Sequence, residues 1–125
     1  MAQKIKITVE DLVFDGELND TGTAERVYEA LPIKGEVNLW GQEIYFSTPV
    51  KADNNDDKRA EMGVGELAFW PSGQAVCIFW GPTPASVADE PRAVSPVVPI
   101  GQLKGDIEAL DTIDDGQTIR VEKLD

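Results

Sequence analysis

The sequence predicts a mainly β protein with one or two short helices, whose strands form a closed barrel or a sandwich. Apolar and polar residues alternate over several short runs, as they do in half-buried strands. Glycine and proline, at 11 and 8 of the 125 residues, separate these runs and supply the turns. A chain of this length supports one hydrophobic core, so we expect a single domain over residues 1–125.

The first third of the chain is predicted to hold two strands and a helix. Residues 4–10 alternate cleanly and residues 12–18 alternate again, so a tight turn would pair the two strands. A helix over 21–31 follows, because apolar residues recur at helical spacing from Ala24 onward until Pro32 ends the pattern. The side chains expected to dock this helix are Ala24, Val27, Tyr28 and Leu31.

The middle of the chain is predicted to form two strands and a hairpin. The strands lie at 36–40 and 42–47, with Gly41 between them. In the segment 63–84, two apolar runs rich in Val, Ile, Phe and Trp flank a Pro-Ser-Gly-Gln turn at 71–74. These residue types suit a pleated, half-buried surface, so the segment indicates a β-hairpin.

A polar segment at 51–61 separates these elements, and we expect it to be a solvated, mobile acidic loop. Residues 53–57 have the alternating acidic and amide spacing of a calcium loop. However, Lys58 stands where such a loop requires glycine, and Val64 stands where it requires glutamate. The pattern therefore does not predict a calcium site.

The C-terminal third is predicted to be less regular. Residues 81–99 contain five of the eight prolines and are expected to be irregular, with a short strand at 97–100. One or two helical turns are expected at 105–110, and a last strand at 117–123. The predicted core of the whole fold is Ile5, Ile7, Phe14, Val37, Leu39, Ile44, Phe46, Leu67, Phe69, Val76, Ile78, Ile119 and Val121.

Composition excludes several classes of function. A net charge of −12 repels phosphate backbones and anionic lipids, so we expect neither a nucleic-acid nor a membrane partner. The chain has no histidine, the commonest general base and zinc ligand, and a single cysteine, Cys77, which we expect to be buried and inert. We expect no metal and no cofactor. A lone thiol and an N-terminus without an apolar signal core favour the cytoplasm.

Four segments together resemble a known family. They are Thr-Ala-Glu-Arg-Val-Tyr-Glu-Ala-Leu-Pro at 23–32, Trp-Gly-Gln-Glu-Ile-Tyr-Phe at 40–46, Gly-Glu-Leu-Ala-Phe-Trp-Pro-Ser-Gly at 65–73, and Ala-Val-Cys-Ile-Phe-Trp-Gly-Pro-Thr-Pro at 75–84. In this order they resemble the small, atypical cyclophilin-like proteins of prokaryotes. The resemblance covers nearly the whole chain and implies a closed cyclophilin-like β-barrel capped by one or two short helices.

The resemblance does not carry over the activity of true cyclophilins, which are peptidyl-prolyl isomerases. Their site uses an arginine in a Phe-His-Arg stretch, followed by a Gln-Gly-Gly motif, and this chain has neither. Its arginines are Arg26, Arg59, Arg92 and Arg120. We therefore expect a small-molecule or peptide-binding module without isomerase activity, and a weak or divergent isomerase is the alternative.

Five polar and aromatic residues form the candidate ligand-binding site: Trp40, Glu43, Tyr45, Glu66 and Trp70. They lie in the segments that carry the resemblance, on the strand faces opposite the predicted core. Tryptophan and tyrosine offer broad stacking area with a polar tip, and glutamate offers an acceptor. In so acidic a protein, such a site suits a neutral or cationic ligand better than an anion.

Other interpretations of these residues stay open. Trp40 and Trp70 would close the end of a barrel, and glutamates on strand faces are usually solvated. Glu43 and Glu66 would serve as a paired acid and base if the fold brought them close together. No catalytic residue is predicted, and the sequence leaves the ligand and the oligomeric state open.

Overall fold

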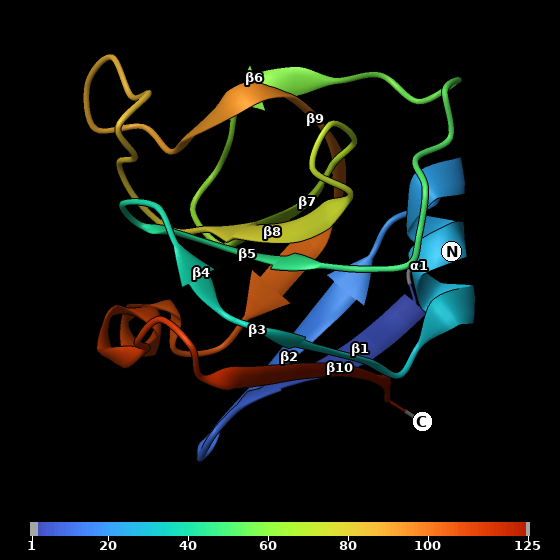
Figure 1. The fold of residues 1–125 in the computed structure, drawn as a ribbon, viewed down its shortest axis with the longest axis horizontal. Helices are drawn as coiled ribbons and strands as arrows, with labels where there is room; N and C mark the ends of the chain where they lie inside the picture. The colour runs from blue at the N-terminus through green and yellow to red at the C-terminus, as the bar shows by residue number, and fades with distance from the viewer. Residues whose placement is uncertain (1–2, 125) are drawn as a thin grey trace.

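An antiparallel ten-stranded sheet dominates residues 3–124, the part of the chain that our computed structural model describes (Figure 1). The strand order is β3-β10-β1-β2-β9-β7-β8-β5-β4, and β6 pairs with β9 to one side of this path. The strands are β1 (Gln3–Val9), β2 (Leu12–Leu18), β3 (Ile33–Glu36), β4 (Asn38–Leu39), β5 (Glu43–Ser47), β6 (Arg59–Glu61), β7 (Glu66–Trp70), β8 (Ala75–Phe79), β9 (Arg92–Lys104) and β10 (Thr118–Lys123). The helices are α1 (Gly22–Ala30) and the 3-10 helix η1 (Ile107–Thr112).

The N-terminal hairpin confirms the prediction from alternation. β1 and β2 pair from Gln3 opposite Leu18 to Val9 opposite Leu12. Glu10 makes the tight turn between them with a positive φ of 51°. Because side chains alternate across a strand, this register directs the apolar residues of both strands into the core.

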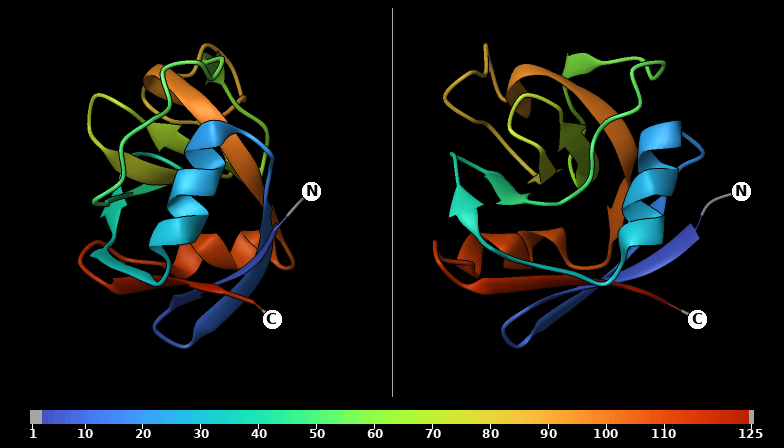
Figure 2. Two further views of the ribbon diagram at one scale, coloured as in Figure 1. Left: turned by 90° about the vertical axis from the view of Figure 1, so that its right-hand side faces the viewer. Right: turned by 45° about the vertical axis from the view of Figure 1, so that its right-hand side comes forward.

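Helix α1 lies across one side of the curled sheet, as Figure 2 shows. Thr21 caps its N-terminus by accepting a hydrogen bond from the Ala24 N–H at 3.1 Å. Of the residues predicted to dock the helix, Ala24, Val27 and Leu31 are buried and Tyr28 is half-buried. None of the helices in residues 3–124 is long and apolar enough to cross a membrane.

The segment 51–61 is more structured than predicted. The Asp56 carboxylate accepts hydrogen bonds from the N–H groups of Gly22 at 3.2 Å and Thr23 at 2.7 Å, and from the Thr23 hydroxyl. Burial acts to raise the pKa of Asp56, but the Thr23 and Gly22 hydrogen bonds outweigh it and lower the pKa. The acidic segment therefore holds the start of α1. Residues 3–124 contain no group of three or more Asp, Glu, His or Cys side chains that could hold a metal ion.

We expect Asp56→Ala to lower the free energy of unfolding by about 1–2 kcal/mol, because it leaves N–H groups at the helix start without their carboxylate partner. Asp57→Ala removes the neighbouring exposed carboxylate and is the matched control. Urea unfolding of both variants at neutral pH measures the difference. Equal stability of the two variants would contradict a capping role for Asp56.

The predicted hairpin is confirmed as β7 and β8. The Gln74 N–H donates to the Pro71 carbonyl at 3.2 Å and closes the turn between the strands. All five residues of β8 are buried, so both faces of this strand are covered. One face belongs to the main core, and the other face packs against a second layer.

That second layer corrects the prediction for 81–99. β9 runs from Arg92 to Lys104, where the sequence predicted only a short strand at 97–100. Its first half pairs with β6, and its second half pairs with β7 and β2. The register shifts where Leu67 pairs with Gly101 and Ala68 pairs with Pro99. Proline cannot donate to a ladder, and a bulge is a position where that missing donor is tolerated.

The core therefore has two parts. The larger cluster contains every predicted core residue except Leu39, which is partly buried at its margin. The smaller cluster lies between the outer face of β5, β8 and β7 and the β6–β9 ribbon, and it was not predicted. Its buried members are Met62, Ala68, Cys77, Phe79, Ala93 and Val97.

The predicted closed barrel is not confirmed. β3 and β4 are the two ends of the strand order, and within residues 3–124 no ladder pairs them side by side. Instead, side-chain packing joins β3 to β5, since a Cβ on Gly35 would lie 3.1 Å from the Phe46 ring. The sheet curls around the larger core cluster but stays open as a hydrogen-bonded sheet (Figure 1).

Candidate functional site

A cavity of about 150 Å³ lies beside the smaller core cluster, between the outer face of the sheet and β9. β5 contributes Glu43 and Tyr45, the end of β7 contributes Trp70, and the turn after β4 contributes Trp40. The complete lining is Trp40, Glu43, Tyr45, Trp70, Ala93, Val94 and Val97.

Strand alternation explains how β5 builds this site. Ile44 and Phe46 are fully buried in the larger core cluster, which directs Glu43 and Tyr45 to the opposite face. Trp40 follows β4, the strand before β5 in the chain, and its backbone N–H donates to the Glu43 carbonyl at 2.9 Å. This bond keeps the Trp40 backbone beside the start of β5.

The aromatic walls are held in place. The Tyr45 and Trp70 rings meet edge to face, with centroids 6.0 Å apart and planes at 85°. The Trp70 indole N–H donates to the Ser95 hydroxyl oxygen at 2.9 Å. Ring geometry of this kind is favourable, and the hydrogen bond uses the polar tip of Trp70, so the ring itself faces the cavity as apolar surface.

Among residues 3–124, Glu43 is the charged residue that the fold buries. Its side chain is 5% exposed, and it stands with three threonines as the buried polar residues of 3–124. Burial raises the pKa of Glu43 to about 7, and a hydrogen bond with the Cys77 thiol acts in the opposite direction. No lysine or arginine in the described part of the chain pairs with this carboxylate.

Cys77 lies behind Glu43 and is buried, as predicted. Burial raises the pKa of its thiol well above the ordinary value, and the neighbouring Glu43 adds to that effect. The thiolate is the reactive form of cysteine, so this thiol is unreactive at neutral pH.

The structure brings four of the five predicted site residues together and leaves Glu66 outside. Phe79 on the intervening strand β8 is the register partner of both Glu43 and Glu66. The two glutamates therefore sit on either side of a buried ring, with Cα atoms about two strand spacings, or roughly 10 Å, apart. Glu66 forms an ion pair with Arg59 and accepts the Gly63 N–H at 2.8 Å. The two carboxylates thus face different surroundings and do not share a site.

Three lining residues, Ala93, Val94 and Val97, were missed by the sequence analysis. They belong to the first half of β9, where Ala93 and Val94 fall in a segment predicted to be irregular because of its prolines and Val97 begins the short strand predicted at 97–100. The apolar residues that flank Pro96 were the available signal. Val94 is 59% exposed, which places it at the rim of the cavity.

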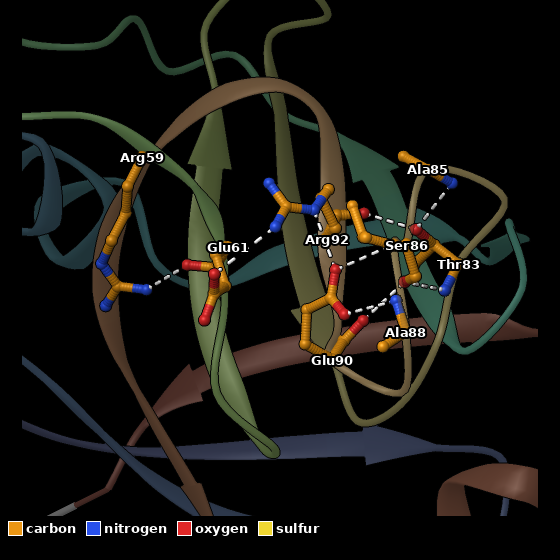
Figure 3. A network of polar contacts seen from close by, with 9 residues as sticks. Arg59, Glu61, Thr83, Ala85, Ser86, Ala88, Glu90 and Arg92 are labelled. Carbon is orange, nitrogen blue, oxygen red and sulfur yellow. Dashed lines mark hydrogen bonds and ion pairs between the residues drawn. The ribbon is translucent and has the colours of Figure 1, made fainter.

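A network of polar contacts positions this wall (Figure 3). The Glu90 carboxylate accepts the N–H groups of Val87 at 2.9 Å and Ala88 at 2.8 Å, and it pairs with Arg92 Nε at 2.9 Å. These contacts, led by the Val87 N–H, lower the pKa of Glu90 to about 2. Because Arg92 also reaches Glu61 of β6 at 3.4 Å, the network ties the start of β9 to its neighbour.

The chain is similar to known proteins over almost its full length. The family model described as Cyclophilin-like matches residues 3–122. The solution structure of a hypothetical protein from Archaeoglobus fulgidus superimposes with a TM-score of 0.83 at 32% sequence identity, and the match covers 98% of this chain and 95% of that chain. No curated protein matches the sequence.

Proposed function

We propose that this chain, which belongs to the cyclophilin-like family, is a binding protein that holds a small molecule or a peptide side chain in the cavity between β5 and β9. The observation that carries the proposal is a buried carboxylate, Glu43, inside an apolar and aromatic cavity. Burying an ionisable group is costly, and such groups with strongly shifted pKa values gather at functional sites. An enclosed apolar surface with a few polar groups is the usual form of a ligand site.

The size of the cavity limits what enters it. Typical sites for whole ligands measure roughly 300–1,000 Å³, and this one measures about 150 Å³. We therefore propose that it takes the head group of a ligand, or one side chain of a peptide, while the remainder lies over the rim near Val94.

Tryptophan resonances offer a direct test of binding. We expect neutral and cationic fragments, titrated into the ¹⁵N-labelled protein, to shift the indole N–H signals of Trp40 and Trp70. The third tryptophan is an internal control, because the Trp80 indole N–H is bound to Asp111 at 2.7 Å and lies outside the cavity. If no fragment of either class moves the Trp40 and Trp70 signals, or if Trp80 moves equally, the cavity is not a binding site.

Prolyl isomerisation, the activity of true cyclophilins, is the alternative function. Isomerases need a donor near the prolyl nitrogen to ease the loss of amide resonance. The residues that line the cavity include no arginine. Each arginine of the chain binds another group of the protein: Arg26 binds backbone carbonyls, and Arg59, Arg92 and Arg120 pair with glutamates.

We expect no acceleration in a protease-coupled proline isomerisation assay, in which the uncatalysed exchange takes tens of seconds or longer. A true cyclophilin run in parallel is the positive control. Clear acceleration that is lost in Tyr45→Ala or Trp70→Ala would replace our proposal with catalysis in this cavity.

A further inference from the structure

We propose that the cavity selects an alkylammonium group, carried either by a free small molecule or by a lysine side chain of a peptide. This inference rests on the proposed binding function and names the chemistry of its ligand. Its basis is the combination of one buried carboxylate with three aromatic side chains around a small apolar space.

The first step concerns charge. Glu43 is nearly excluded from water, and no cationic side chain in the described residues pairs with it. An ionised carboxylate in such a place is stable only when a cation or several donors face it. The other lining side chains are aromatic or aliphatic, so a cationic ligand is the partner that would compensate this charge.

The second step concerns the walls. The faces of tryptophan and tyrosine rings attract ammonium groups within about 6 Å, and the attraction strengthens when the cation is desolvated. The cavity is surrounded by three half-buried aromatic side chains, Trp40, Tyr45 and Trp70. Because Tyr45 and Trp70 meet edge to face, the planes of these two rings are nearly perpendicular. The arrangement offers an alkylammonium group aromatic surface on more than one side and a carboxylate at the buried end.

The third step excludes the opposite class of ligand. A carboxylate or phosphate would need a cationic partner, and the lining contains no lysine or arginine. The donors that its side chains offer, the Trp40 indole N–H and the Tyr45 hydroxyl, are neutral and do not compensate a negative charge. An anionic ligand would also be repelled by Glu43 and by the net charge of −12 over the whole chain. The same charge raises the local concentration of cations near the mouth of the cavity.

The test compares two probes of nearly equal shape, choline and its neutral carbon analogue 3,3-dimethylbutan-1-ol. Each is titrated into the full chain while the Trp40 and Trp70 indole signals are followed. We expect choline to bind at least about tenfold more tightly. We also expect Glu43→Gln to weaken choline by a similar factor, and the matched control Glu25→Gln, on the exposed face of α1, to leave it unchanged.

A second pair of probes separates the two sources of the group. The peptides acetyl-Gly-Lys-Gly-amide and acetyl-Gly-norleucine-Gly-amide differ only in the terminal ammonium. A lysine preference larger than the choline preference assigns the site to a protein side chain, and the reverse assigns it to a free small molecule that carries an alkylammonium group.

The outcomes distinguish this inference from the proposed function. Equal affinity for choline and its neutral analogue, or tighter choline binding by Glu43→Gln, overturns the ammonium inference and leaves a binding site for neutral groups. If none of the four probes shifts Trp40 or Trp70, both the inference and the proposed function fail. The comparison of probes on the unmodified protein does not depend on whether the variant folds.

Discussion

Replacing Ile78 by alanine is expected to lower the free energy of unfolding by about 2–5 kcal/mol. Ile78 lies at the middle of β8 and is fully buried. Its register partners are Ile44 on β5 and Leu67 on β7, which are buried to the same degree. The substitution removes three carbon atoms from a place where the strands on both sides prevent collapse, so the cost includes a cavity as well as the lost transfer free energy.

Urea unfolding at constant pH measures this difference, with Val13→Ala as the control. Val13 lies on β2 with 60% of its side chain exposed, and its truncation is expected to change stability by no more than about 0.5 kcal/mol. A cost for Ile78→Ala as small as that of the control would show that Ile78 faces solvent and that the assignment of faces on β8 is wrong.

Alternation made most of the fold predictable. In β1 and β5, a strict period of two separates the core face from the outer face, so Ile7 and Ile44 could be assigned inward without any tertiary information. The helix was equally predictable, because the helical spacing of its apolar residues shows where it lies and Pro32 marks where it ends.

The second layer was not predictable in the same way. Pro96 and Pro99 indicated an irregular segment, yet β9 continues through both. Whether a proline ends a strand depends on whether a neighbouring strand needs its N–H, and that is decided by a register that the sequence does not display. This layer covers the outer face of β8, where the burial of Cys77 was predicted but the burial of Phe79 was not.

Four of the five residues predicted for the site line the cavity, and Glu66 does not. The reason is again a relation between strands that the sequence does not display. Alternation determines on which face Glu43, Tyr45 and Trp70 lie, but not how far apart they lie across strands. Glu66 shares that face, but the buried Phe79 ring and the ion pair with Arg59 separate it from the cavity. Contacts of this kind join segments remote in the chain, so spacing alone gives no signal for them.

Glu43→Gln is expected to remove a dependence of stability on pH. Burial raises the pKa of Glu43 from the ordinary 4.5 to about 7 in the folded protein. Between these two values the folded protein keeps a proton that the unfolded chain has released, so the free energy of unfolding falls as pH rises through this window. Above about pH 7 both states are ionised and the contribution of Glu43 is constant. At about 1.4 kcal/mol per unit of pKa, the unmodified protein should lose about 2–3 kcal/mol relative to the variant between about pH 5 and pH 8.

The measurement is urea unfolding of both proteins across that range, and the difference between their stabilities is the quantity of interest. Glu17, Asp56, Glu90 and Asp111 have lowered pKa values, so their contributions change at acid pH in the opposite direction. These groups are present in both proteins and cancel in the difference.

If the difference in the free energy of unfolding between the two proteins stays constant across this pH range, water reaches Glu43 and the pKa of its carboxyl is not raised. If choline added at about pH 8 removes the difference in the free energy of unfolding between the two proteins, the buried charge of Glu43 is connected to the ligand. The reason is that a bound cation stabilises the ionised carboxylate of the unmodified protein, which the variant lacks.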